Sequence, residues 1–428
     1  MSQVKLFGNR RSHRVAAAPE SPKRHKNRRP RSALRTWTIV LLVLAALEGC
    51  YFLCVYSNIP FIAKWRNIYI QTAMDTMNHQ WLATAFIPRS IIDEVMAARD
   101  EAKEIQAEHN SSDNWADQSG TSSEVSDSNS NTDVDSAEEA FYELFWELDR
   151  NSMETYLKQH PEALDNGWEN LYINEAGLDD EGTSIQTTMG EQVLAIDVPN
   201  QILLLRVSGS GYRGVLAVAK DPSRLSVEVS SGIGGYGEYA GTIAEKNNGV
   251  LAMTASGFID PGGVGNGGLL AGYCRSNGED HYGTSYGWSY KRLELREDNY
   301  FYIVDVSSPV DDRTTDAMEF TPALVIDGET LPTPGWDSLN PRAIIGQSDK
   351  GEILMMVIEG RLIDSLGITV QDCGPILERH NCMQAMNVDG GTSAILWYDG
   401  EYVTRCSNTA CPEGRQLPNA FVYGKSPK

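Results

Sequence analysis

Asp389 stands at the mouth of a glycine-rich bend, in the stretch AMNVDGGTSAILWYDG at residues 385–400. It follows one apolar run and precedes Gly390 and Gly391, after which a second β-like apolar run ends in a turn. Glycine allows a positive φ and a close approach of the backbone to a ligand. An ordinary turn between two buried strands would explain the glycines alone. The added carboxylate favours a loop that binds a ligand and acts on it.

Two arginines accompany this carboxylate. Arg342 follows Pro341 and opens one apolar run, and Arg361 follows Gly360 and closes the next. With a turn between residues 347 and 351, the two runs predict adjacent strands whose arginines meet in space. Arginine binds phosphate or carboxylate through paired hydrogen bonds, so this set predicts an anion site. Surface ion pairs remain the alternative for each arginine taken alone.

Several common catalytic motifs do not occur. Neither a P-loop nor a dinucleotide fingerprint is found in a strand–loop–helix setting. Ser393 lacks the flanking glycines of a nucleophile elbow. The chemistry therefore depends on carboxylates and arginines.

The cysteines favour neither zinc nor a unique disulfide pattern. No histidine clusters with the five that follow the N-terminal apolar segment, which argues against a zinc site. Cys373–Cys382 and Cys406–Cys411 are locally plausible disulfides that leave Cys274 unpaired, but connectivity cannot be deduced from sequence.

Charge divides the chain sharply. Residues 1–36 hold eleven Lys/Arg and one acid, whereas the whole chain carries −22, so residues 37–428 carry about −32. Between these parts, residues 37–56 are twenty mostly apolar residues, enough to span a bilayer. The basic tail predicts a cytoplasmic N-terminus and an extracellular main domain, joined by a transmembrane signal-anchor in the cell membrane. A cleaved signal peptide and a lipoprotein box at Cys50 are the alternatives. The acidic exterior argues against nucleic acid as a partner.

The remaining chain divides by composition and by the periodicity of its apolar residues. We predict a helical membrane-proximal stalk at 57–109 with possible self-association, an acidic Ser/Asn-rich linker at 110–139, and a helical segment at 140–189. Within the linker, residues 127–138 place oxygen-bearing side chains at calcium-loop positions, but Thr132 stands where that loop needs glycine. Calcium is therefore the only cofactor that the sequence raises, and a chance match in an acidic segment is the alternative.

Residues 190–424 alternate short β-like runs with Gly, Pro, Asn or Asp turns. A helix, or two short ones broken at Gly374–Pro375, interrupts them at 364–384. This pattern predicts an α+β fold: a β-rich, mixed-sheet catalytic domain with few helices, preceded by the transmembrane helix and the stalk.

Four stretches of this region resemble the phosphodiester glycosidase family. They are GFIDPGG, PRAIIGQSDKGEILMMVIEGR, MNVDGGTSAILW and RQLPNAFVYG. The family includes the lysosomal uncovering enzyme, an N-acetylglucosamine-1-phosphodiester alpha-N-acetylglucosaminidase, and bacterial proteins of exopolysaccharide biosynthesis. The basic tail, single anchor and stalk are similar to the architecture of membrane-anchored bacterial members.

The resemblance implies hydrolysis of the glycosidic bond of sugar-1-phosphodiesters in cell-surface or exopolysaccharide glycans. Carried over by position, Arg342 is the phosphate clamp and Asp389 the catalytic carboxylate. Substrate-binding positions on the same basis are Arg361, Gly390, Gly391, Ser393, Gly257, Phe258 and Asn419. No metal ligands are predicted among these residues.

The sequence departs from the family pattern at Thr254, Thr392, Ala394 and Glu359. These departures keep a second class open, a non-catalytic glycan-binding or exopolysaccharide assembly module on the same fold. A third interpretation is a structural envelope protein that assembles through its helices.

Overall fold

The computed structural model describes residues 31–76, 79–113, 115, 133–260, 264–285 and 291–425. The chain forms two compact units, residues 1–58 and 59–428. The first unit contains α1 (Arg31–Tyr56), within which Arg35–Tyr56 is long and apolar enough to cross a membrane. A signal sequence would satisfy the same criterion, so the helix agrees with either interpretation of the N-terminal segment.

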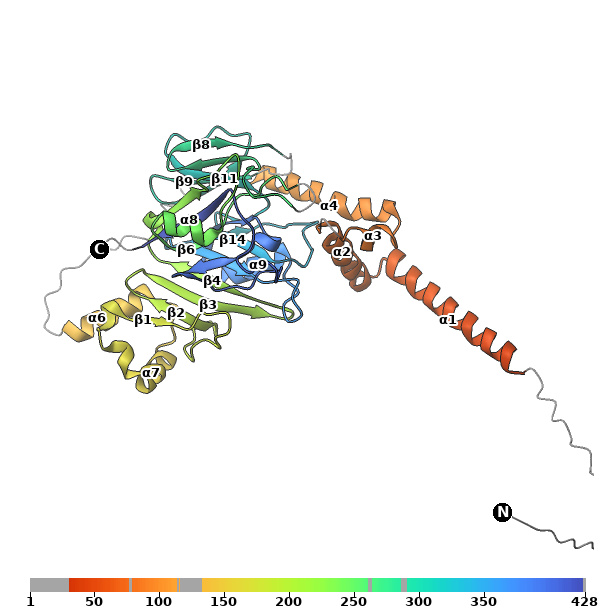
Figure 1. The fold of residues 1–428 in the computed structure, drawn as a ribbon, viewed down its shortest axis with the longest axis horizontal. Coiled ribbons are helices and arrows are strands. Elements are labelled where there is room, and N and C mark those ends of the chain that lie inside the picture. Colours follow the sequence, from red (N-terminus) through yellow and green to blue (C-terminus); the bar gives the residue numbers. More distant parts are fainter. Residues whose placement is uncertain are drawn as a thin grey trace, which may run out of the picture. The chain divides into compact units, whose positions relative to one another are not determined.

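The second unit is built on a nine-stranded sheet (Figure 1). Its strand order is β1-β2-β3-β4-β15-β14-β16-β12-β13. The bounds are β1 (Tyr172–Asn174), β2 (Gln192–Asp197), β3 (Ile202–Gly209), β4 (Tyr212–Ala219), β12 (Ala323–Ile326), β13 (Glu329–Thr330), β14 (Arg342–Ser348), β15 (Ile353–Ile358) and β16 (Cys382–Val388). The sheet begins at β1, upstream of the predicted domain start at residue 190.

Two five-stranded sheets complete the β structure. One has the order β10-β9-β11-β7-β8 and the other β18-β17-β6-β19-β5. Their bounds are β5 (Leu225–Val229), β6 (Gly249–Thr254), β7 (Tyr273–Ser276), β8 (Glu279–Tyr282), β9 (Lys291–Arg296), β10 (Phe301–Asp305), β11 (Thr314–Phe320), β17 (Leu396–Tyr398), β18 (Glu401–Tyr402) and β19 (Asn419–Gly424). One apolar core joins all three sheets, with Met355, Phe421 and Phe301 among its members.

The β-rich α+β architecture with few helices is confirmed. The ladders between the named strands are antiparallel, where the sequence reading was a mixed sheet. Short loops between consecutive strands, such as residues 210–211 between β3 and β4, allow antiparallel hairpins.

Helices cover one face of the nine-stranded sheet. These are α6 (Asp133–Leu144), α7 (Arg150–Gln159) and α9 (Val370–Glu378). Phe145, Met153 and Cys373 pack with sheet residues such as Val218 and Ile344. The short α8 (Ala240–Lys246) packs instead on β6 and β19. α9 runs through Gly374–Pro375, where the sequence suggested a break, because the Thr369 side chain caps its start and its apolar face is buried.

The predicted stalk contains α2 (Pro60–Met74), α3 (Trp81–Thr84) and α4 (Arg89–Glu108). It does not stand apart from the sheets. The buried side chain of Gln106 donates to Ala323 O at 2.9 Å and accepts from Ala323 N at 2.8 Å. Downstream, Ser111 accepts from Ile303 N, and buried Trp115 donates to Phe301 O. Residues 59–115 are therefore fastened to the sheets, through α4 and the segment that follows it.

The predicted calcium positions fall largely outside the described residues. Residues 127–132 are not described, and Asp133 begins α6. Neither predicted disulfide is formed: the five cysteines of this unit are free thiols. Cys373 lies in α9 and donates to Thr369 O, whereas Cys382 lies in β16 and donates to Gln384 O.

Candidate active site

The ends of three central strands bring the predicted chemistry together. Arg342 opens β14 and lies opposite Ile358 at the end of β15, two residues before Gly360. On the other side of β14, Ala343 lies opposite Val388, the last residue of β16. Because the strands are antiparallel, Arg342, Arg361 and Asp389 all emerge at one end of the sheet. These strands are buried along their whole length, except for the partly buried Met383 in β16, as expected for the centre of a sheet covered on both faces.

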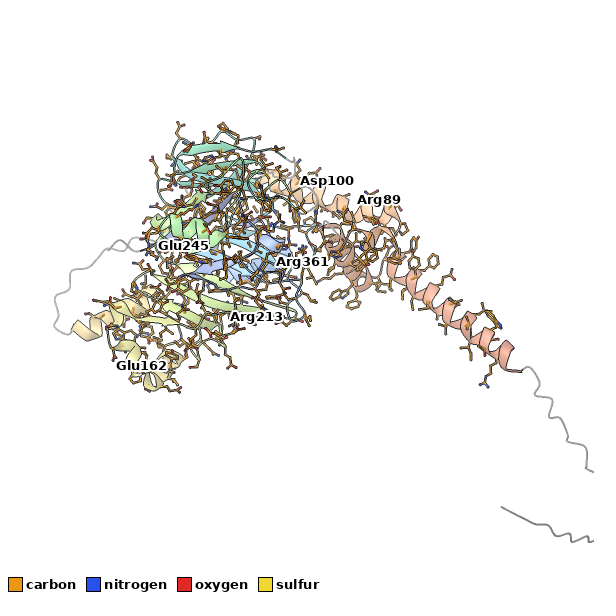
Figure 2. All side chains as sticks on the ribbon, in the orientation of Figure 1. Arg89, Asp100, Glu162, Arg213, Glu245 and Arg361 are labelled. Atoms are coloured by element: carbon orange, nitrogen blue, oxygen red, sulfur yellow. The ribbon has the colours of Figure 1, made fainter. Side chains whose placement is uncertain are left out.

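A cavity of about 910 Å³ lies at this end. Figure 2 shows Arg361 on the side of the sheets where α2 lies. Of the residues that the sequence singled out, the cavity is lined by Asp389, Arg342, Arg361, Gly390, Gly391, Ser393 and Phe258. This volume lies within the usual range of small-molecule sites, and a sugar phosphate would fit.

Asp389 lies on the cavity wall directly after β16. Its backbone N–H donates to Ala255 O at 3.1 Å, and its Oδ2 is buried with no hydrogen-bond partner among the described residues. Burial raises the pKa of the carboxyl to about 7, although hydrogen bonding from Ser393 and the charge of Arg415 oppose the shift. A carboxyl group with this pKa can exchange a proton near neutral pH.

Arg342 is buried at the same place. Its Nη2 donates to Ser338 O at 2.8 Å and to Ser338 Oγ at 2.9 Å, and its Nε donates to Ile368 O at 3.3 Å. Burial lowers the pKa of the guanidinium below its usual range, partly offset by the charge of Asp75. Within the described part of the chain, no carboxylate forms an ion pair with Arg342.

Arg361 comes from a strained position, with a φ of 58° in a non-glycine residue. Its Nε and Nη2 donate to Asn340 Oδ1 at 3.2 and 2.9 Å. It too lacks an ion-pair partner among the residues that the structure describes. Two guanidinium groups without carboxylate partners on one cavity wall have the chemistry to bind an anion.

The loop requires Gly390 because of a close contact and Gly391 because of its backbone conformation. A Cβ on Gly390 would lie 2.9 Å from Pro341 O, which is too close for any side chain. Gly391 has a φ of 62°, and a Cβ there would lie 3.5 Å from Arg361 Nη1. The loop thus presses its backbone against the two segments that carry the arginines.

A second carboxylate lines the cavity, and the sequence analysis did not single it out. Asp260 accepts from Arg415 Nη1 at 2.8 Å, and the Arg415 guanidinium lies 5.1 Å from the centre of the Phe258 ring. Burial favours a higher pKa for Asp260, but Arg415 and the Gly265 N–H outweigh it, so the pKa lies below its usual range. Asp389 and Asp260 are thus a pair of carboxyls whose pKa values are moved in opposite directions, a pattern of acid–base sites. Both Asp260 and Arg415 stand within or beside the family-like stretches, so this signal was available.

Four other residues that line the cavity were not among the predicted site residues, although Asn387 stands in the stretch MNVDGGTSAILW. Asp75, Thr76 and His79 come from the predicted stalk and line the cavity. Asn387 also lines it, donating to Thr321 O while its Oδ1 has no hydrogen-bond partner in the described structure.

Two predicted substrate-binding residues are not among the cavity-lining residues. Asn419 is fully buried: it accepts from Ser256 N at 2.9 Å and donates to Ser256 Oγ and Cys274 Sγ, both at 3.0 Å. Gly257 accepts from Ala271 N at 3.0 Å. In this structure both residues hold the segment that presents Phe258.

The departures from the family pattern lie in different surroundings. Thr392 lines the cavity, and Thr254 and Ala394 are buried. Glu359 is buried and pairs with Arg405 at 2.6 Å, away from the cavity wall. Thr392 is therefore the departure that a bound ligand would meet.

The sequence model of the phosphodiester glycosidases matches residues 240–423. The match falls in the region whose motifs resemble that family, and Arg342, Arg361, Asp260 and Asp389 all lie within the matched residues. A curated relative, the SPbeta prophage-derived uncharacterized protein YomE of Bacillus subtilis (strain 168), is 33% identical over 76 residues, which cover 17% of this chain and 12% of that protein. The matched segment thus spans only a small part of that relative's length.

Two solved structures are also similar. The zebrafish N-acetylglucosamine-1-phosphodiester alpha-N-acetylglucosaminidase catalytic domain, auto-inhibited by its pro-peptide, matches with a TM-score of 0.43 and 19% identity, over 52% of this chain and 82% of that one. A hypothetical protein from Synechocystis matches with a TM-score of 0.38 and 14% identity, over 54% of this chain and 63% of that one.

Proposed function

We propose that this protein hydrolyses the glycosidic bond of a sugar 1-phosphodiester at the outer face of a cell membrane. The observation that carries the proposal is the pair Arg342 and Arg361. Both guanidinium groups lie on the cavity wall beside Asp389, and neither has a carboxylate partner among the described residues. A buried cation without a counter-ion is costly, so such a site favours binding an anionic group.

The chemistry follows from the charges. Cleavage at the sugar carbon leaves a phosphomonoester, a good leaving group on which negative charge develops. Guanidinium donors aimed at that charge stabilise the transition state, and one such donor typically contributes about 100- to 1,000-fold in rate. The ionised form of Asp389 acts on the sugar side, either as base for the attacking water or as nucleophile.

Asp260 supplies a constant negative charge beside Asp389. Its pairing with Arg415 holds it ionised, and its negative charge helps to keep the pKa of Asp389 high. Phe258, under the Arg415 guanidinium, offers an apolar surface for a sugar ring.

Location at the membrane rests on α1 and the charge distribution. The eleven Lys/Arg of residues 1–36 favour a cytoplasmic N-terminus, with the acidic remainder outside. The substrate is then a cell-surface or exopolysaccharide glycan bearing a sugar phosphodiester, and no nucleic acid, metal or cofactor takes part in the proposed reaction.

The test uses the full chain in detergent with a panel of sugar 1-phosphodiesters. Wild type should release free sugar, whereas Asp389→Asn and Arg342→Ala should lose at least 100-fold in kcat/KM with their fold intact. Arg313→Ala is the control, because Arg313 pairs with Asp311 outside the cavity. If no panel member is hydrolysed, yet glycan binds and Arg342→Ala weakens binding, hydrolysis is refuted and a glycan-binding module remains.

A further inference from the structure

An aromatic face covers the helices that precede the catalytic sheets. It consists of Phe61, Trp65, Tyr69, Trp81 and Phe86, which keep between 45% and 72% of their surface exposed. Phe61, Trp65 and Tyr69 recur at four-residue spacing and so follow one side of α2. The surfaces of soluble proteins seldom expose this many large aromatic residues together. The aromatic face is therefore expected to contact another molecule or a membrane.

Packing between α2 and α3 supports the aromatic face. Tyr69 donates its hydroxyl to Leu82 O at 2.8 Å, which joins α2 to α3. Ile68, Ile70 and Ala83 of the same two helices are buried. The aromatic residues therefore project from a packed base and are not the exposed core of an incomplete fold.

Its charge sets it apart from the rest of the chain. Residues 59–86 contain Lys64, Arg66 and a single acid, Asp75, whereas residues 37–428 as a whole carry about −32. The carboxylate of Asp75 points away to Arg99, 2.6 Å from its Nη2. Aromatic side chains with lysine and arginine at their margins are the composition of a membrane–water interface.

We propose that the aromatic face lies in the lipid headgroup region, and that the substrate is a membrane-resident sugar 1-phosphodiester whose second ester carries a lipid chain. Only residues 57–59 separate α1 from α2, a chain length of about 10 Å. If α1 spans the bilayer, as proposed above, α2 begins at the membrane surface. The inference on substrate rests on the proposed function, whereas that on the face does not.

The same helical hairpin forms part of the cavity wall. Asp75, Thr76 and His79 follow α2 and line the cavity. Ser338 Oγ donates to Asp75 Oδ2 at 2.6 Å and accepts from Arg342 Nη2 at 2.9 Å. Two hydrogen bonds through Ser338 thus link Asp75, which directly follows α2, to the proposed phosphate clamp. A phosphodiester at the headgroup level would reach Arg342 while its lipid chain stays in the bilayer.

The reaction on such a substrate balances with water alone. The water oxygen forms a bond to the anomeric carbon and loses one proton, which the carboxylate of Asp389 accepts when it acts as base. The bond from that carbon to the bridging oxygen breaks. The electron pair stays on the phosphate, so the products are the free sugar and a lipid phosphate monoester.

The first test compares two substrates in the same proteoliposomes. Full-length wild type and the double variant Phe61→Ser/Trp65→Ser are assayed on a polyprenyl-phosphate sugar and on a water-soluble methyl phosphodiester of the same sugar. The double variant should lose at least tenfold on the lipid substrate and keep its rate on the soluble one. Tyr282→Ser is the control, because Tyr282 is an equally exposed aromatic residue on β8, outside the cavity lining. The proposal would be overturned if the double variant kept the wild-type rate on both substrates, or if it lost the same factor on both.

A second measurement does not depend on activity. Nitroxide-labelled lipids should quench tryptophan fluorescence less in Trp65→Phe and Trp81→Phe than in wild type, because those indoles lie at the headgroups. Unchanged quenching, with cross-linked dimers that the double variant abolishes, would make the face an interface between copies and refute the membrane assignment. Quenching without hydrolysis of either substrate would retain the face and reject both the proposed function and the lipid substrate.

Discussion

Replacing Asp389 with asparagine should stabilise the protein while it removes activity. Burial raises the pKa of this carboxyl from 3.8 to about 7. Between those values the native state holds a proton that the unfolded chain has released, so this group makes stability fall as pH rises through the window. Above pH 7 the native state must hold a buried ionised carboxylate, and the resulting loss of stability is complete. Asparagine carries no charge, so the variant does not lose this stability.

The size of the effect can be worked from the structure. A shift of about three pKa units corresponds to about 4 kcal/mol in the free energy of unfolding. Part of the residue faces the open cavity, where water solvates the charge, so we expect about 2 kcal/mol. For the roughly 370 residues of unit 59–428, the unfolding entropy is about 0.8 kcal/mol per kelvin, and Tm should rise by about 2–3 °C.

The assay is thermal unfolding of both proteins at pH 8 and at pH 4.5. Asp389→Asn should melt higher at pH 8, and the two curves should nearly coincide at pH 4.5, where the native carboxyl is protonated. Asp364→Asn is a control of opposite sign, because pairing with Arg405 lowers the pKa of that exposed carboxyl. A Tm of Asp389→Asn equal to or below that of wild type at pH 8 would refute the buried-carboxyl argument.

Four further predictions follow from the same geometry. The kcat/KM for a sugar phosphodiester should rise with pH around a midpoint near 7, since the ionised form of Asp389 is the active one, and a flat profile from pH 5 to 9 would contradict that role. Arg342→Lys keeps the charge but cannot reproduce the three hydrogen bonds to Ser338 and Ile368 O, so steady-state kinetics should show a loss of at least about 30-fold. Gly391→Ala places a side chain at a φ of 62°, and urea unfolding should show a loss of about 1–2 kcal/mol. Gln106→Ala leaves Ala323 N–H and C=O unpaired, which should cost about 2 kcal/mol by the same measurement, and an unchanged midpoint would mean that α4 does not support the sheets.

Sequence reasoning predicted the central strands well because their signal is local. The runs RAIIGQS, ILMMVI and CMQAMNV are short, mostly apolar and bounded by Gly, Pro, Asn or Asp, as buried strands are. Antiparallel order then follows from the short turn at residues 349–352, where Gly351 has a φ of 83°. This is why Arg342 and Arg361 could be placed together from the sequence, whereas Asp389 was added to them by the family resemblance, because the pairing of β14 with β16 spans a longer connection.

The contribution of residues 59–115 could not be predicted in the same way. Their helical periodicity is visible, but which surface a helix packs against depends on contacts more than 200 residues away, such as Gln106 with Ala323. Asp75 gave no signal, since an acid near the end of a helix is common. Asp260 is different: it stands in a quoted stretch, and only its ion pair with Arg415 distinguishes it from a turn residue.

Both proposed phosphate-binding arginines depend on one hydrogen-bond network, and this network sets the boundary of the functional unit. Arg361 donates to Asn340 Oδ1, Asn340 Nδ2 donates to Ser338 Oγ at 2.9 Å, and the same hydroxyl accepts from Arg342 and donates to Asp75. A serine hydroxyl has one proton and two lone pairs, so all of its hydrogen-bonding capacity is used. Without Asp75 the hydroxyl proton loses its acceptor, which weakens the part of the network that orients Asn340 and Arg342 through Ser338. Residues 190–424, which the sequence predicted as the catalytic domain, would therefore retain Asp389 and both arginines but lack the Asp75 acceptor of the network that orients the arginines. The unit that the geometry defines begins at α2.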